Sequence, residues 1–204
     1  MIYIGLDLGK MRDYTAIAIL DELPHNEWGV RYLERAPLGT PYLRVVQRVT
    51  ELTNHPTLAG RCHLTMDASG VGNPVEEALR AARGGWRAMT AVTITGGDKA
   101  RQASGYGGIG ERWNVPRRDL LSNIQVLLEK GNLKISAEMP ETRALVRELI
   151  RLRRSPKSPQ NQSDPDNSAG GSSRQEHDDL VMAVALACWQ ATRPKIGLGM
   201  NRIL

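Results

Sequence analysis

Cysteine and long apolar segments are scarce in this sequence, and their scarcity excludes several classes of protein. Cys62 and Cys188 lie far apart in separate apolar segments, so we expect buried thiols and no disulfide. The sequence has no run of about 18 apolar residues that would predict a transmembrane helix, and its N-terminus lacks the basic and apolar regions of a signal peptide. No cysteine and histidine cluster has the spacing of a zinc site. The default expectation is an intracellular protein.

The length and the charge of the chain set the next limits. Its 204 residues are enough for one well-buried domain and marginal for two, so we expect a single domain over residues 1–204. The net charge is +5 and the sequence pI is about 9.5. An excess of cations suits a polyanionic partner such as DNA, because neutralising phosphates releases counterions. Charge alone does not exclude a basic protein without such a partner.

Hydrophobic periodicity predicts an α/β fold, with a mixed sheet of five or more strands flanked by helices. Apolar runs predict strands at residues 2–8, 15–20, 28–35, about 61–67, 86–95 and 133–135. Helical spacing and helix-start residues predict five helices, at residues 42–53, 74 to about 84, 116 to about 130, about 141–153 and 180–191. The first two strands are expected to form a hairpin.

Two polar stretches are expected to be loops. Residues 96–114 are rich in glycine and are interpreted as a surface loop. Residues 155–175 are low in complexity and can bury little surface, so they are expected to form a mobile loop. Ser173 and Glu176 then have the spacing of a capping box, which predicts the start of the last helix.

Aspartates close three separate segments, and their positions are the most informative feature of the chain. Asp7 and Asp67 end apolar strands, while Asp178 and Asp179 open the apolar last helix. If the two strands are parallel neighbours, both carboxylates lie at the edge where open α/β sheets place their sites. The last helix, packed on the same face, would bring its aspartates to this point. Clustered carboxylates repel one another unless a cation compensates, and oxygen ligands favour Mg²⁺ or Mn²⁺.

Each aspartate also has a simpler explanation. Asp7 and Asp67 precede glycines and are typical of turns, and acidic residues in the first turn of a helix interact favourably with the helix dipole. The coincidence of three such positions favours a metal site over three unrelated aspartates. Two ions about 3.5–4 Å apart would activate a water and stabilise the leaving oxygen at a phosphodiester.

Three motifs together point to a known family. They are Gly5-Leu6-Asp7-Leu8-Gly9, Met66-Asp67 at a strand end, and His177-Asp178-Asp179-Leu180-Val181-Met182-Ala183. In these motifs the chain resembles the RNase H-like nuclease domain of phage terminase large subunits. The resemblance covers nearly the whole chain, and the His-Asp-Asp helix is its most specific part.

The resemblance implies an endonuclease that cuts concatemeric bacteriophage DNA during genome packaging, with two Mg²⁺ or Mn²⁺ ions as cofactors. Asp7, Asp67, Asp178 and Asp179 would be catalytic metal ligands, with Asp179 favoured as a direct ligand and Asp178 as a second ligand or an outer-shell group. His177 would be an outer-shell group or a DNA contact, and its simpler explanation is a helix-start residue without chemistry. The implied partners are double-stranded DNA, an ATPase, the small terminase and the portal protein, in the cytoplasm of the host cell. No G-x-x-x-x-G-K-[ST] loop occurs, so we do not expect ATP-driven translocation in this chain.

Two groups of cations are candidate DNA contacts. One is a stripe on the fourth predicted helix, formed by Arg143, Arg147, Arg151 and Arg154. The other surrounds the glycine-rich stretch and is formed by Lys99, Arg101, Arg112, Arg117 and Arg118. A solvated helix face is the simpler explanation of the stripe. Neither group contains interleaved aromatic residues, so we expect mainly backbone contacts and weak sequence preference.

Three other functions remain open at this point. A Holliday-junction resolvase would share the strand-end carboxylates and the acidic helix. An actin-like kinase would explain Asp7-Leu8-Gly9 with Thr15 as a phosphate loop, although 204 residues fall short of its two domains. A DNA-binding or motor-docking module with a degenerate site would bind DNA tightly without cutting it.

Overall fold

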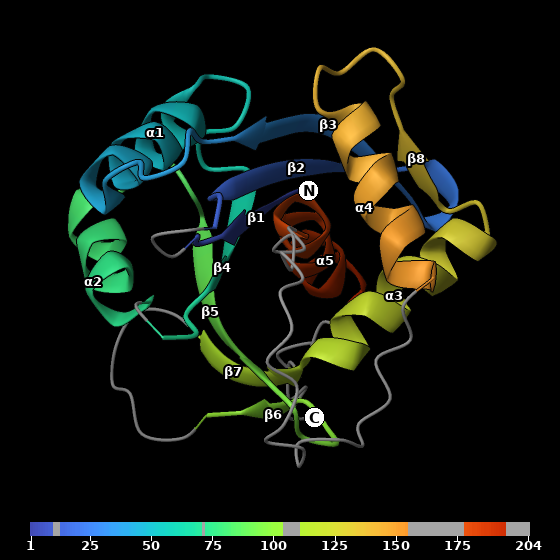
Figure 1. Ribbon diagram of the computed structural model, residues 1–204. Helices are drawn as coiled ribbons and strands as arrows, with labels where there is room; N and C mark the ends of the chain where they lie inside the picture. Colours follow the sequence, from blue (N-terminus) through green and yellow to red (C-terminus); the bar gives the residue numbers. More distant parts are fainter. Residues whose placement is uncertain (10–12, 71, 104–110, 155–177, 195–204) are drawn as a thin grey trace, which may run out of the picture.

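The computed structural model describes residues 1–9, 13–70, 72–103, 111–154 and 178–194 (Figure 1). The strands are β1 (Ile2–Asp7), β2 (Ala16–Leu23), β3 (Glu27–Arg35), β4 (Cys62–Asp67), β5 (Ala88–Thr95), β6 (Arg101–Gln102), β7 (Glu111–Pro116) and β8 (Leu133–Ile135). The helices are α1 (Tyr42–Asn54), α2 (Gly72–Ala82), α3 (Arg117–Glu129), α4 (Thr142–Arg154) and α5 (Asp179–Thr192). A short 3₁₀ turn, Pro24–Asn26, joins β2 to β3.

The strands of the described residues form one mixed sheet in the order β6-β7-β5-β4-β1-β2-β3-β8. β1 pairs antiparallel with β2 and parallel with β4, and β4 pairs parallel with β5. The predicted hairpin and the mixed sheet of five or more strands are confirmed, and the parallel pairing of β1 and β4 fulfils the condition on which the expected acidic site depends. Because β1 and β4 run in the same direction, their carboxyl ends lie at one edge of the sheet.

Different helices cover the two faces of the sheet (Figure 1). Leu6 of β1 packs in a core that includes Leu79 of α2 and apolar side chains of α1. Tyr3, on the opposite face, packs in a second core with side chains from α3, α4 and α5. Side chains alternate along a strand, so Gly5 and Asp7 follow Tyr3 onto the face that carries α5. The alternation of β1 therefore directs its terminal carboxylate toward α5.

α5 is buried along nearly its whole length, and every residue from Asp179 to Ala191 is buried. It contacts the sheet on one side and α3 and α4 on the other, which gives it the central place in its layer (Figure 1). A helix that is apolar on all sides is stable only when it is enclosed in this way. Enclosure makes Asp179, which is 5% exposed, a buried carboxylate at the start of the helix.

The predicted surface loop at residues 96–114 is wrong for part of its length. β6 and β7 lie in this stretch, and β7 pairs with β5 on one side and β6 on the other. The error arises because these strands lie near the edge of the sheet, where polar residues such as Arg101 and Asn114 are tolerated and the apolar pattern is weak. Residues 104–110, the predicted mobile loop at 155–175 and the predicted capping box lie outside the described residues.

Two smaller expectations can be compared with the structure. Cys62 and Cys188 are buried and unbonded to each other, as predicted. Among the helices of the described residues, none combines the length and the apolar character that crossing a bilayer requires.

Candidate metal centre

The ends of β1 and β4 bring Asp7 and Asp67 together. Leu6 and Met66 are partners in the parallel pairing, and each aspartate is the next residue of its strand. Neighbouring strands are about 4.8 Å apart, so the two aspartates leave the sheet side by side. Asp67 also pairs with Val92 of β5, which places it between two strands of the sheet rather than in a free loop.

The backbone of α5 touches β1 at Gly5, two residues before Asp7. A Cβ atom built on Gly5 would lie 1.9 Å from the carbonyl oxygen of Ala183 and 3.0 Å from the amide nitrogen of Ala187. Any residue larger than glycine would therefore collide with the helix. Asp179 lies one helical turn before Ala183, so this close approach carries the acidic start of α5 toward Asp7.

The electrostatics of Asp7 show that the carboxylates act on one another. Burial raises the pKa of Asp7 well above its ordinary value, and the charges of Asp67, Asp179 and Asp178 raise it further. The charge of Arg117 opposes this shift. Carboxylates from three separate segments therefore concentrate negative charge at one place. A carboxylate in this setting is favoured in its protonated form unless a further cation approaches.

Two of the aspartates have hydrogen-bond partners within the protein. Asp178 forms an ion pair with Arg117, the first residue of α3, whose other terminal nitrogen lies 3.3 Å from the sulfur of Met182. Asp67 Oδ1 accepts a hydrogen bond of 2.7 Å from the backbone amide of Ser69. Asp67 therefore stabilises the turn after β4, which was its simpler explanation, while its charge also acts on Asp7.

The described ranges contain no three His, Cys, Asp or Glu side chains that converge closely enough to hold a metal ion together. A carboxylate has about four acceptor sites, so Asp67 can keep the Ser69 hydrogen bond while it binds an ion, whereas Asp178 would have to turn from Arg117 to bind one directly. The donor set still fits a hard divalent cation, because it consists of carboxylate oxygens. His177 lies outside the described residues.

The predicted DNA contacts are placed unequally. On α4, Arg143, Arg147 and Arg151 are exposed, and so are Lys99 and Arg101 near β6. The side chain of Arg154 lies outside the described part of the structure.

The other cations of the second group are held by acidic partners. Arg112 is mostly buried and forms an ion pair with the buried Glu76, so it is poorly placed for DNA. Arg118 pairs with Asp98, and Arg117 with Asp178 at the candidate metal centre.

One buried acid was not predicted as a functional residue. Glu148 of α4 is 4% exposed, forms an ion pair with Arg35 and accepts a hydrogen bond from the backbone amide of Val181 at 3.1 Å. Burial raises the pKa of Glu148 to about 7, although Val181 and Arg35 both act to lower it. The sequence contained an indication, because Glu148 is the only acidic residue of its helix and lies next to Leu149 on the apolar face.

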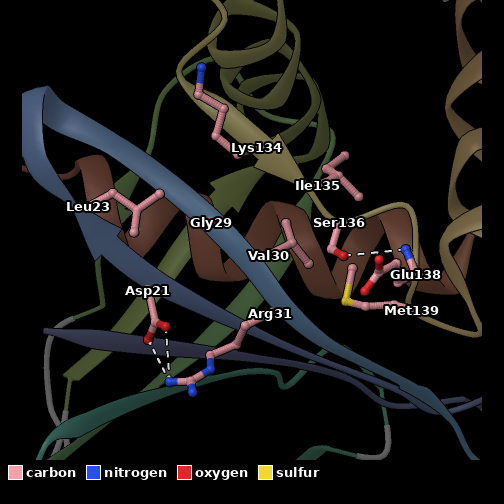
Figure 2. A pocket seen from close by; sticks show the side chains of 10 residues that line it. All are labelled: Asp21, Leu23, Gly29, Val30, Arg31, Lys134, Ile135, Ser136, Glu138 and Met139. Atoms are coloured by element: carbon pink, nitrogen blue, oxygen red, sulfur yellow. Dashed lines mark hydrogen bonds and ion pairs between the residues drawn. The ribbon is translucent and has the colours of Figure 1, made fainter.

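A cavity of about 610 Å³ lies away from the aspartates, between the end of β8 with the residues that follow it and the β2–β3 hairpin (Figure 2). It is lined by Asp21, Arg31 and Lys134 among others, and Asp21 and Arg31 pair with each other across it. Asp21 is the register partner of Ile2, at the beginning of β1, so this cavity is at the opposite end of the strand from Asp7. It is therefore not part of the candidate metal centre.

Solved structures with a similar fold include viral terminase nucleases. The large terminase nuclease of the thermophilic phage G20c with bound magnesium matches with a TM-score of 0.59 at 25% identity, over 93% of this chain and 81% of that chain. The human cytomegalovirus terminase nuclease domain, soaked in manganese with an inhibitor bound, matches with a TM-score of 0.53 at 13% identity, over 92% and 82%. No protein-family profile and no curated protein sequence matches the chain. The predicted RNase H-like fold is thus confirmed, and it is the fold of large-terminase nuclease domains.

Proposed function

We propose that this chain is a Mg²⁺- or Mn²⁺-dependent endodeoxyribonuclease that cuts DNA during viral genome packaging. The observation that carries the proposal is that Asp7 and Asp67 leave adjacent parallel strands side by side while α5 packs against β1, and the charges of the neighbouring aspartates together with burial raise the pKa of Asp7. Such a concentration of carboxylates is unfavourable until divalent cations bind, and the fold is that of nucleases whose structures include magnesium-bound and manganese-soaked forms.

The roles of the residues follow from their positions. Asp7, Asp67 and Asp179 would hold the ions, with Asp178 as a second ligand or an outer-shell group. When two ions are bound, they supply an activated water and stabilise the leaving oxygen of the phosphodiester. The protein fixes two of the carboxylates on adjacent strands and the third on a buried helix, which holds them in place before substrate binds.

Arg117 would have two roles in this proposal. It neutralises part of the carboxylate charge through its pair with Asp178, and its side chain is 42% exposed. If Asp178 turned toward an ion, the Arg117 guanidinium would become available to a phosphate oxygen of the DNA. Guanidinium groups bind phosphate well, because their planar fork can donate two parallel hydrogen bonds.

The DNA would contact the protein mainly through its backbone. The exposed Arg143, Arg147 and Arg151 of α4, followed by Arg154, would follow one stretch of phosphates. α4 packs against α5, so this stripe belongs to the same layer as the acidic helix. Packaging would further require an ATPase domain or subunit, the small terminase and the portal protein.

Cleavage of supercoiled plasmid tests the proposal. We expect nicking and linearisation with Mn²⁺ or Mg²⁺, no cleavage with EDTA, and a loss of at least about 100-fold in Asp7→Asn, Asp67→Asn and Asp179→Asn, because even outer-shell changes cost 10–100-fold. The matched control is Asp21→Asn, which removes a carboxylate at the far end of the sheet and should cut within about twofold of the wild-type rate. Full activity of Asp67→Asn would reject the site. A strong preference for four-way junctions over linear duplex would replace packaging by junction resolution.

A further inference from the structure

The N-terminus of α5 is not capped by the side chain of its own N-cap residue. Asp178 is the N-cap residue, with φ −129° and ψ 26°, but its side chain makes no capping hydrogen bond. An N-cap aspartate ordinarily accepts a hydrogen bond from the amide of the second or third helical residue. Asp178 pairs with Arg117 instead, so the amide of Val181, the third residue of α5, needs another acceptor.

Glu148 supplies that acceptor from α4. Its Oε2 atom accepts the hydrogen bond of the Val181 amide at 3.1 Å, in a fully buried setting. Residues 148 and 181 are 33 positions apart, so this is a cap provided by a different helix. A carboxylate at this position also interacts favourably with the positive end of the α5 dipole.

The capping carboxylate is itself held in place. Glu148 Oε1 pairs with Arg35, which ends β3 and lies opposite Ala16 of β2 in the sheet. The Arg35 guanidinium lies 5.1 Å from the centre of the Tyr14 ring. Arg35 is thus fixed by the sheet and by an aromatic ring, and through Glu148 it ties the start of α5 to β3, in the same sheet as β1 and β4.

We propose that Glu148 is a positioning residue that caps α5 from α4 and thereby keeps the Asp178 carboxylate available for the metal centre. The inference rests on the proposed metal-dependent function. If Glu148 did not cap the helix, Asp178 could turn back to the Val181 amide, as N-cap aspartates do, and would leave Arg117 and the centre. Asp179 would at the same time lose the fixed orientation of its helical turn.

Two variants separate capping from general stability. Glu148→Gln keeps a carbonyl oxygen that can accept the Val181 hydrogen bond, whereas Glu148→Ala removes the acceptor altogether. The control for loss of a buried acid is Glu76→Ala, because Glu76 is also buried and paired with arginines but does not contact α5. Circular dichroism identifies any variant that does not fold, and Glu148→Gln keeps the test open if Glu148→Ala is such a variant.

The first readout needs no metal. Amide hydrogen exchange should become at least about tenfold faster at Leu180 and Val181 in Glu148→Ala, and should change little in Glu148→Gln or Glu76→Ala. The second readout is Mn²⁺ affinity, followed by electron paramagnetic resonance. It should fall by about 10–100-fold in Glu148→Ala, in line with other changes around metal ligands. It should stay within about threefold of the wild type in Glu148→Gln.

The two readouts fail independently. Unchanged amide exchange in Glu148→Ala would overturn the capping role, whatever the enzyme does. Faster exchange with unchanged Mn²⁺ affinity would show that the cap does not position the carboxylates, and would also overturn the inference. A wild-type protein that binds no Mn²⁺ would instead refute the proposed function, and the exchange measurement would still decide whether Glu148 caps α5.

Discussion

Replacing Gly5 with alanine would push α5 away from β1 next to the candidate metal centre. The added Cβ would lie 1.9 Å from the carbonyl oxygen of Ala183, about 1.5 Å short of the 3.4 Å at which ordinary van der Waals contact begins. The obstacle is helix backbone, which cannot rotate away as a side chain can. Overpacking of this kind costs about 1–3 kcal/mol in the free energy of unfolding. A shift of about 1 Å in catalytic geometry can cost about 100-fold in rate.

We therefore expect Gly5→Ala to lose about 1–3 kcal/mol of stability and about 100-fold in Mn²⁺-dependent plasmid cleavage. Urea unfolding measures the first change, and cleavage well below the unfolding transition measures the second. The matched control is Gly96→Ala, because a Cβ on Gly96 meets no atom within 4 Å. The reasoning would be refuted by a folded Gly5→Ala protein that cuts DNA at the wild-type rate, because α5 would then not need its close approach to β1.

The remaining predictions concern pH. Arg117 lowers the pKa of Asp7, so Arg117→Gln should move the onset of Mn²⁺ binding to higher pH, as a titration at several pH values would show. The pKa of Glu148 is raised from 4.5 to about 7, which means that the folded state binds the carboxyl proton more tightly than the unfolded state does. The free energy of unfolding should therefore fall by roughly 3 kcal/mol as pH rises from about 4.5 to 7. Urea unfolding of Glu148→Gln should lack that slope. The pKa of His63 is lowered by burial to about 4, so stability should fall by about 1–3 kcal/mol as pH drops from 6.5 to 4, and His63→Gln should abolish this loss.

The predicted position of the acidic site depended on information that the sequence carries locally. Asp7 and Asp67 each end an apolar run, and the register of β1 and β4 then aligns them without further assumptions. Strand alternation puts Gly5 on the same face as Asp7, and the close approach of α5 explains why no side chain is present there. Strand ends and strand faces are properties of a few consecutive residues, which is why they could be predicted.

The contacts that refine the site are not local, and for this reason the sequence did not reveal them. The hydrogen bond between Glu148 and Val181 and the pair between Arg117 and Asp178 each join helices that are distant in the chain. The pairing of Arg112 with Glu76 likewise depends on the position of β7 beside β5, and most of β7 lies in the stretch that was predicted as a loop. Periodicity identifies an element and its buried face, but it does not state which elements will be neighbours.

The central claim is that Asp7, Asp67 and Asp179 share divalent cations, and anomalous diffraction from a crystal soaked in Mn²⁺ tests it most directly. The account predicts anomalous peaks within about 2.0–2.6 Å of carboxylate oxygens of Asp7 and Asp67, with Asp178 turned away from Arg117. Crystals that bind Mn²⁺ only elsewhere, with Asp178 still paired to Arg117, would contradict it.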